Sequence, residues 1–452
     1  MKVVIAGCGM IGETIIADLV KENNDITVID SDPMVVKEMN DIYDVMGVEG
    51  IATHYETLIE ANVQKADFFV AITPSDEMNM LACFIAKKLG ARHATARIRN
   101  VEYNNENLIQ LRSMMNIHSL NPDRLAASEF YHLLKLPAAV HVESYAQNRF
   151  EMAEIILNEN SKLDGLSLAD MRSKYKGDYL IGVVKRDDKV YIPNGDFVLR
   201  TGDKIGFFAS NHDLRKLFKS LSILNKEAKN IMIAGASRTA YYLAKDLIKD
   251  CNVTIIEKNK EKCENFAKNL PDAMVIYADA SNHYLLQQEG IKDMDAFIAL
   301  TGNDEENILL SYYAKENGVP TVISKVDKIS SIATAKKLGI DKLVSPKTLV
   351  SESIARSIRA FKNSEGTPIE SLYKLMDEKA EAIEFRAKDN PLYIGIPLRD
   401  LPIRKNIIIA GIIRNQRAIL PFGEDVIKPN DRVIIICAGS QINDLSDIIE
   451  KV

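Results

Sequence analysis

Short runs of apolar, mostly β-branched residues alternate with longer amphipathic stretches through the first 120 residues of the chain. The apolar runs predict strands at Val3–Ala6, Thr27–Ile29, Asp44–Val48, Phe68–Ile72, His93–Ile98 and Ile117–Leu120. The stretches between them predict helices over Ile11–Lys21, Pro33–Asp41, Tyr55–Asn62, Glu77–Leu89 and Asn104–Met115. Strands that alternate with helices in this way are typical of a parallel, doubly wound sheet of the Rossmann type.

The pattern changes after this region. An amphipathic helix is predicted over Pro122–Leu136, and beyond Pro137 short strands with turn signals follow, among them the pair Asp187-Asp188. The sequence Arg200–Lys204 then precedes a strand at Ile205–Phe208. These features predict a small α+β lobe of about 80 residues, a size typical of a compact domain.

The whole pattern occurs twice. The segment Val3–Gly7 returns as Ile231–Gly235 and Asp67–Thr73 returns as Asp295–Thr301, both with an offset of 228 residues, and the amphipathic helix has its counterpart at Pro346–Phe361. A register kept over such a length indicates duplication of a domain pair. We therefore expect two tandem Rossmann-like domains, each followed by a small α+β C-terminal lobe, over residues 1–137, 138–222, 230–365 and 366–452.

Composition narrows the class of protein. A net charge of −6 argues against a nucleic-acid partner, which needs a concentrated basic face. No apolar run approaches the roughly 18–20 residues needed to span a bilayer, and the N-terminus has no signal-peptide pattern. The five cysteines are scattered without a CxxC motif, as expected of free thiols in a reducing compartment. These features predict a cytoplasmic protein that reaches a membrane only through a partner.

A glycine-rich loop stands between the first predicted strand and helix, where a Rossmann domain binds the pyrophosphate of a dinucleotide. Its residues are Gly7, Cys8, Gly9, Met10, Ile11 and Gly12. Asp30 ends the second predicted strand, where a carboxylate accepts a hydrogen bond from a ribose hydroxyl. An arginine there would have favoured a 2′-phosphate, so the sequence favours NAD or an adenosine ligand over NADP.

The second copy departs from this fingerprint. Gly235 remains, but Ser237 replaces the second glycine, Arg238 follows it, and Ala240 takes the place of the third. Glu257 still ends the second strand of this copy. The sequence leaves two interpretations open, a second ligand site or a Rossmann fold retained without a ligand.

An ordered set of motifs resembles the TrkA family, the regulatory subunits of Trk-type potassium uptake systems. The motifs are Met1–Gly12, Asp25–Asp30, Ala66–Asn79 and Ala96–Arg99, with Asp295–Asn307 in the second copy. Members of this family consist of two tandem RCK units, each a Rossmann lobe followed by a small lobe. The resemblance implies a nucleotide-controlled homo-oligomeric ring, expected to be a tetramer, on the inner face of the membrane. Its partner would be a potassium-translocating integral membrane subunit of the TrkH/TrkG kind, and its ligand NAD(H) or ATP/ADP.

Carried over by motif, the resemblance adds Thr73 and Arg97 to the first nucleotide site, and the repeat adds Thr301 to the second. Two positions depart from the family pattern. The first copy has Gly50-Ile51-Ala52 where the family often has Gly-Asp-Ala, although the second copy keeps Ala278-Asp279-Ala280. Lys325 stands where the first copy has Arg97, and a lysine is a weaker bidentate partner of phosphate.

The alternative is an NAD-dependent oxidoreductase with duplicated Rossmann domains. Such an enzyme needs a proton donor or acceptor beside the nicotinamide. The seven histidines show neither pairing nor metal-ligand spacing, and no GxSxG, HExxH or P-loop motif is present. The sequence therefore favours a ligand-driven switch with no catalytic or metal-binding residues.

Overall fold

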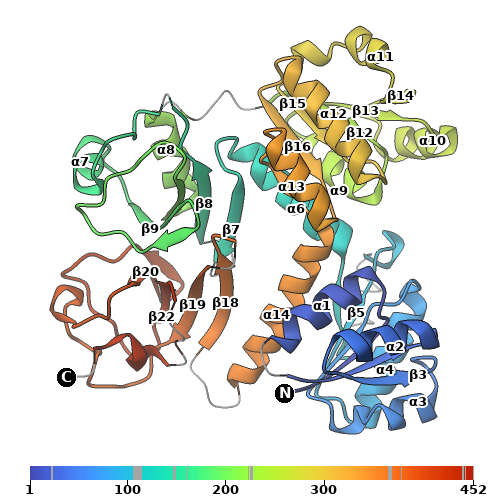
Figure 1. Ribbon diagram of the computed structural model, residues 1–452, viewed down its shortest axis with the longest axis horizontal. Coiled ribbons are helices and arrows are strands. Elements are labelled where there is room, and N and C mark those ends of the chain that lie inside the picture. The colour runs from blue at the N-terminus through green and yellow to red at the C-terminus, as the bar shows by residue number, and fades with distance from the viewer. Residues whose placement is uncertain are drawn as a thin grey trace.

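The computed structural model describes residues 1–452 except 22–23, 105–114, 146–148, 160, 222, 224–227, 365–368, 378, 440–441, 443 and 451–452. The predicted helix over Asn104–Met115 lies almost entirely outside the described residues. Figure 1 shows four lobes, two Rossmann lobes on one side of the molecule and two small C-lobes on the other. No described helix is both long and apolar enough to cross a bilayer.

The first Rossmann lobe contains a parallel sheet in the order β3-β2-β1-β4-β5-β6. Its strands are β1 (Lys2–Ala6), β2 (Asp25–Asp30), β3 (Met46–Glu49), β4 (Phe68–Ala71), β5 (His93–Arg97) and β6 (His118–Leu120). Its helices are α1 (Met10–Val20), α2 (Pro33–Ile42), α3 (Tyr55–Glu60) and α4 (Asp76–Leu89), with 3-10 helices η1 (Val63–Lys65) and η2 (Glu102–Asn104). The order confirms the predicted doubly wound α/β class.

The second Rossmann lobe repeats this topology as β14-β13-β12-β15-β16-β17. Its strands are β12 (Asn230–Ala234), β13 (Asn252–Glu257), β14 (Met274–Tyr277), β15 (Ala296–Ala299), β16 (Thr321–Lys325) and β17 (Leu343–Val344). Its helices are α9 (Arg238–Leu247), α10 (Lys260–Asn269), α11 (His283–Gln288), α12 (Asp304–Glu316) and α13 (Ile329–Lys337), with η3 (Ile291–Asp293). Apart from Asn230 at the start of β12, the central strands β12 and β15 are apolar on both faces, as expected of a parallel sheet covered by helices.

Each C-lobe is built on an antiparallel five-stranded sheet, in the orders β10-β9-β11-β8-β7 and β18-β19-β22-β20-β21. The first contains β7 (His141–Tyr145), β8 (Phe150–Ile156), β9 (Tyr179–Arg186), β10 (Lys189–Tyr191) and β11 (Lys204–Ala209), with α7 (Leu168–Lys174) and α8 (Asn211–Ser220). The second contains β18 (Ile369–Leu375), β19 (Ala380–Arg386), β20 (Ile407–Arg414), β21 (Arg417–Ile419) and β22 (Arg432–Cys437), with η4 (Leu398–Asp400) and η5 (Leu445–Ile448). Asp187, with a φ of 53°, makes the tight turn between β9 and β10 that the Asp187-Asp188 pair predicted.

The two amphipathic helices, α6 (Pro122–Lys135) and α14 (Pro346–Ser364), each pack on the Rossmann lobe of the other copy. Helix α6 lies on α9, and α14 lies along α1 in the middle of the molecule (Figure 1). The buried side chains of Val350, Ile354 and Ile358 in α14 share one apolar core with Ile15 and Ile16 of α1. The copies are therefore joined by reciprocal exchange of a helix, which the sequence did not predict.

The two C-lobes also share a core. Phe150 and Phe208 from the first pack with Ile434 and Ile436 from the second. Gly411 permits this approach, because a Cβ atom there would lie 3.0 Å from a ring atom of Phe150. The exchanged helices and the joined C-lobes link all four lobes, so that a shift in one is opposed by packing in the others.

Candidate functional site

The first glycine loop connects β1 to α1 at the carboxyl edge of the first parallel sheet. Gly7 has a φ of 100°, and a Cβ there would lie 2.9 Å from the backbone nitrogen of Thr73. A Cβ at Gly12 would lie 2.2 Å from the carbonyl oxygen of Gly7. No heavy atom lies within 4 Å of a Cβ built at Gly9, which is the N-cap of α1. Two glycines therefore serve packing, while the open side at Gly9 is where backbone can approach a phosphate.

The carboxylate of Asp30 orders this loop from the end of β2. Its Oδ2 accepts a hydrogen bond of 2.7 Å from the backbone N–H of Cys8, and its Oδ1 accepts one of 3.1 Å from that of Asp32. A carboxylate has lone pairs beyond these two bonds, and it can still accept from the hydroxyl of a ribose. Asp30 thus lies where the fingerprint requires an acid, and it orders the backbone of the loop.

Thr73 and Arg97, from the ends of β4 and β5, meet beside the loop. The guanidinium Nη2 of Arg97 donates to the carbonyl oxygen of Thr73 over 2.7 Å. The carboxamide of Asn79 accepts from both the backbone N–H and the hydroxyl of Thr73, over 2.8 and 2.7 Å, and donates to the carbonyl of Arg97 over 3.0 Å. Asn79 is fully buried. This positioning role was not predicted, although the repeat of Asn79 as Asn307 was a visible signal of it.

Arg97 is buried, with 8 % of its surface exposed. Burial lowers the pKa of its guanidinium, and the nearby charge of Arg99 adds to this effect. The Nε of Arg97 has no hydrogen-bond partner among the described residues. A guanidinium is a cation suited to a phosphate oxygen, but this Nε is itself buried and would meet a ligand only after the side chain shifts.

The second loop keeps the same backbone but not the same surface. Gly235 has a φ of 99°, and Glu257 accepts from the backbone N–H of Ala236 over 2.7 Å, as Asp30 does in the first copy. Ser237 is the N-cap of α9, and its hydroxyl accepts from the backbone N–H of Ala240 over 3.2 Å. The Ser237 side chain therefore occupies the open side of the loop and caps the helix there.

Thr301 and Asn307 reproduce the arrangement of the first copy. The carboxamide of Asn307 accepts from the backbone N–H and the hydroxyl of Thr301, over 2.9 and 2.7 Å. Lys325, however, does not contact Thr301 as Arg97 contacts Thr73. Its Nζ lies 3.4 Å from a carboxylate oxygen of Asp327. The cation of the second copy thus pairs with an acid two residues further along the chain.

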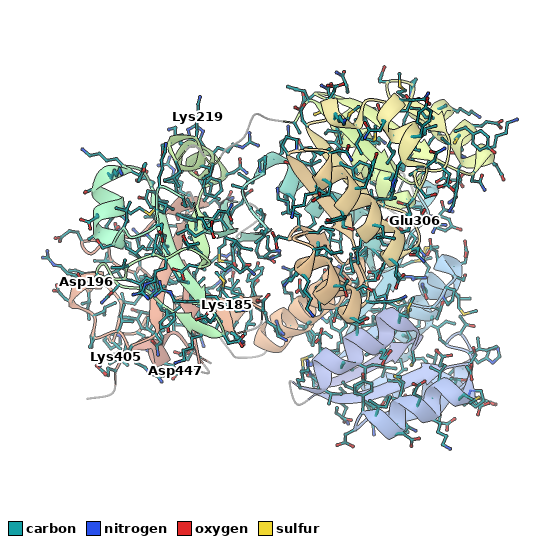
Figure 2. All side chains as sticks on the ribbon, turned by 45° about the horizontal axis from the view of Figure 1, so that its top comes forward. Lys185, Asp196, Lys219, Glu306, Lys405 and Asp447 are labelled. Carbon is teal, nitrogen blue, oxygen red and sulfur yellow. The ribbon has the colours of Figure 1, made fainter. Side chains whose placement is uncertain are left out.

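The second loop opens into a cleft of about 460 Å³. Its lining includes Gly235, Ser237, Arg238, Lys258, Lys262, Asp279, Thr301, Glu306 and Lys325, together with Arg99 and Asp123 from the first copy. Glu306, labelled in Figure 2, lies on the side of the second Rossmann lobe that faces the first. The hydroxyl of Thr239 donates to Asp123 over 3.1 Å, and the Nε of Arg99 lies 3.1 Å from the other oxygen of this carboxylate. The cleft is therefore built by both copies.

The structure brings the predicted residues together in two groups. Gly7, Cys8, Gly9, Met10, Ile11, Gly12, Asp30, Thr73 and Arg97 lie at the carboxyl edge of the first sheet, and Gly235, Ser237, Arg238, Glu257 and Thr301 lie at that of the second. Arg99 and Asp123 were missed, because their place in the second cleft depends on the packing of α6 against α9. No feature of the sequence pattern predicted the contact between α6 and α9.

Comparison with known proteins gives matches in both copies. The TrkA-N domain model matches residues 3–116 and 231–346, and the TrkA-C domain model matches residues 152–222 and 382–450. A Trk system potassium uptake protein TrkA homolog of Methanosarcina mazei is 31% identical over 98% of this chain and 99% of its own length. The corresponding protein of Vibrio alginolyticus is 29% identical over 98% of this chain and 96% of its own length.

Solved structures of similar fold include a GsuK channel bound to NAD, with a TM-score of 0.64 and 18% identity over 97% of this chain and 77% of that one. The GsuK RCK domain has a TM-score of 0.62 and 17% identity over 97% of this chain and 92% of that one. They show that the tandem RCK fold is shared. These curated relatives are named as Trk system potassium uptake proteins and not as oxidoreductases. With both family models matched twice and in order, the chain belongs to the TrkA family.

Proposed function

We propose that the chain is the nucleotide-binding, gating subunit of a potassium uptake transporter and acts on a membrane partner of the TrkH/TrkG kind. The names of the relatives, which are potassium uptake proteins, support this role. We place the protein in the cytoplasm, on the inner face of the membrane, because its partner must carry the ion path. Ligand binding, not catalysis, is the event that changes the flux.

One observation carries the proposal: the helix that follows each glycine loop is the surface on which the other copy's exchanged helix packs. Helix α1 begins directly after the first loop and carries α14. The hydroxyl of Ser351 in α14 donates to Asp18 of α1 over 2.6 Å. A ligand that pulls the N-terminus of α1 toward its phosphates therefore acts on α14, and through α14 on the second C-lobe, because α14 packs on β18.

We assign NAD(H) to the first site and a nucleotide with a compact polyphosphate, ATP or ADP, to the second. The open Gly9 and the acid Asp30 suit a dinucleotide with a free ribose diol. At the second loop Ser237 narrows the approach, while Arg238 and Arg99 add charge suited to terminal phosphates. The fold is shared with the GsuK channel that was solved bound to NAD, which supports the first assignment.

A ring of several such subunits supplies the free energy that gating requires. Moving a two-state equilibrium from mostly closed to mostly open takes about 5.5 kcal/mol of differential binding free energy. If equivalent sites in a ring share this requirement, each nucleotide site needs to supply only a part of it. We propose a homotetramer. Leu81 on α4 and Leu309 on α12 occupy matching positions and are 51% and 64% exposed, as contact residues between neighbouring subunits would be in the isolated chain.

Titration calorimetry of NADH, NAD, ATP and ADP with the wild type, Asp30→Ala and Glu257→Ala tests the site assignment. Asp30→Ala should lose the dinucleotide, Glu257→Ala should lose the mononucleotides, and Asp25→Ala, at the opposite end of β2 from Asp30, should lose neither. Equal binding of every nucleotide by wild type and Asp30→Ala would show that the first site is misassigned. Potassium flux into vesicles containing the copurified membrane subunit, with and without each nucleotide, tests the gating role, and the absence of any potassium transporter from the complex would refute it.

A further inference from the structure

A cavity of about 550 Å³ lies away from both glycine loops, where the exchanged helices meet the C-lobes. Its polar lining comes from eight elements and the turns beside them, including Glu129 of α6, His141 of β7, Lys336 of α13 and Glu352 of α14. Lys185, which also lines it, lies on the side of the C-lobes that faces α14 (Figure 2). The volume is that of a site for a small molecule.

Most charges around this cavity are paired. Lys185 and Lys204 contact the carboxylate of Asp377, with nitrogen–oxygen distances of 2.5 and 3.6 Å, and Lys204 also pairs with Glu154. The Nδ1 of His141 lies 3.4 Å from Glu129. Glu352 differs, since its largely buried carboxyl group accepts no hydrogen bond from any described residue. The charges of His141 and Arg356 act on this carboxyl group, but neither residue donates a hydrogen bond to it, so a cationic donor in the cavity would complete it.

The groups beside Glu352 suit an anion. Helix α14 starts at Pro346, and the hydroxyl of Ser345 caps it by accepting from the backbone N–H of Thr348 over 3.3 Å. Thr348 lies one turn before Glu352, on the same face of the helix and in the lining of the cavity. The N-terminal turn of a helix favours negative charge, and Lys336 adds a cation that is bound only loosely, 4.0 Å from Asp377. A cation site and an anion site therefore lie one turn apart.

Much of the remaining wall of the cavity is apolar, and the charged side chains of Asp187, Asp341 and Lys374 complete the lining. The apolar part consists of Val140, Ile156, Ile332, Leu343, Val344, Leu349 and Met376. A ligand that filled the space would thus present one ammonium group, one carboxylate and an apolar body to the protein.

We propose that this cavity binds an apolar α-amino acid as an effector. Its ammonium group pairs with Glu352, its carboxylate lies at the N-terminal turn of α14 beside Thr348 and Lys336, and its side chain lies against the apolar wall. Because the cavity joins α6, α14 and both C-lobes, the ligand would act on the helices that also contact the nucleotide loops. The proposal does not depend on which nucleotides bind.

The protonation of Glu352 provides a signature of this binding mode. Burial raises the pKa of Glu352 to about 7, and the negative charge of Glu143 adds to the effect. His141 and Arg356 oppose it, and Glu129 adds a smaller unfavourable charge. An ammonium group placed beside Glu352 would favour the ionised form, so that binding at pH 6 should release a proton. The affinity should therefore rise from pH 6 to 8.

The test is calorimetry on the full chain with L-leucine, L-methionine and L-phenylalanine at pH 6 and pH 8, in buffers of different ionisation enthalpy. We expect saturable binding with proton release at pH 6, and no binding of N-acetyl-L-leucine or L-leucinamide, each of which lacks one charged group. Glu352→Gln should lower the affinity at least tenfold and abolish the proton release. Glu316→Gln, an exposed substitution in α12, should change neither.

Two further variants keep the test decisive if Glu352→Gln fails to fold. Thr348→Val should lower the affinity several-fold, and Lys336→Ala should do the same, with unfolding transitions like that of the wild type. The proposal is overturned if none of the three amino acids binds at millimolar concentration. It is also overturned if the acetylated or amidated analogues bind as well as L-leucine, or if the folded variants bind it with wild-type affinity.

Discussion

The hydroxyl of Ser351 and the carboxylate of Asp18 form a 2.6 Å hydrogen bond between residues 333 positions apart in the chain. The Nζ of Lys347 also lies 3.3 Å from the sulfur of Met10, at the first residue of α1. The start of α14 is thus tied to the helix that begins at the nucleotide loop. These contacts give one physical route from the first site to the second copy.

Replacing Ser351 by alanine should weaken this route. Loss of this part-buried hydrogen bond, whose acceptor Asp18 also lies 3.7 Å from the Nζ of Lys21, should reduce stability by about 1 kcal/mol. We expect Ser351→Ala to bind NADH at the first site nearly as well as the wild type. The change in potassium flux that this binding causes should be smaller than in the wild type. Ser357→Ala is the matched control, because among the described residues the Ser357 hydroxyl donates only within its own helix, to the carbonyl of Ser353. Equal loss of coupling in both variants would show that the Ser351 contact is not specific.

Exchanging Gly9 of the first glycine loop with Ser237 of the second should exchange part of the nucleotide selectivity of the two sites. A side chain at Gly9 meets no protein atom, and its φ of −64° suits any residue, so Gly9→Ser should fold normally. It should nevertheless lower NADH affinity at the first site about tenfold, or about 1.4 kcal/mol, since the hydroxymethyl group stands where the pyrophosphate approaches. Calorimetry would measure this loss.

The reverse change, Ser237→Gly, should let a dinucleotide bind the second site and should cost only a few tenths of a kcal/mol of cap stability. Gly7→Ala is the contrasting variant, because its φ of 100° and its contact with Thr73 predict misfolding of the loop and not altered selectivity. If Gly9→Ser bound NADH as tightly as the wild type, the open side of the loop would not be the phosphate site.

The stability of the protein should fall as the pH rises from 5 to 8. The pKa of Glu352 is raised from 4.5 to about 7 in the folded chain, so the folded state favours the protonated form. This contribution is fully present below pH 4.5 and is lost as the pH passes through 7, with a total of about 3 kcal/mol. Glu352→Gln, which stays neutral, should therefore unfold at a higher temperature than the wild type at pH 8 but not at pH 4.5. Glu316→Gln should follow the wild type at both values, and parallel pH curves for Glu352→Gln and wild type would contradict the shift.

Much of each lobe could be predicted because its signals are local. The run Val3–Ala6 before the glycine loop and Asp30 after the second apolar run lie in β1 and at the end of β2, as expected. The strand predicted at Asp44–Val48 instead spans Met46–Glu49, because β3 begins only where Met46 comes into register with Thr27 of β2. The boundary was set by pairing and not by the hydrophobic run.

The way the copies join could not be predicted. The apolar stripe on Pro122–Leu136 shows that this helix is buried on one face, and any apolar surface of suitable shape satisfies that pattern. Whether it packs on its own lobe or on α9 depends on contacts between residues more than 100 positions apart, such as Asp123 and Thr239. Because α6 packs on α9, residues of the first copy line the second cleft, and the sequence predicted neither feature.

Assembly into a ring should depend on the exposed leucines of α4 and α12. The double variant Leu81→Glu/Leu309→Glu places a charge on each matched position, and burying either charge in a contact would cost several kcal/mol. We expect light scattering to report a tetramer for the wild type and a smaller species for the variant, with unchanged thermal unfolding of the chain. Leu392→Glu, at an exposed leucine of the second C-lobe, is the control. A variant that remained tetrameric would place the ring contacts elsewhere.

Arg99, a residue of the first copy, should contribute to ligand binding in the cleft of the second copy. Its side chain lines the second cleft, and Asp123 holds it there while also accepting from Thr239. Arg99→Ala should weaken ATP and ADP binding at the second site about tenfold, because a charge-assisted contact to phosphate is lost. The loss should be greater for ATP than for ADP if Arg99 faces the terminal phosphate. Arg92→Ala removes a cation from the opposite end of the first sheet and should leave both affinities unchanged. If Arg99→Ala lowered NADH binding at the first site and left ATP binding unaltered, the arginine would serve its own copy and the second cleft would not be composite in function.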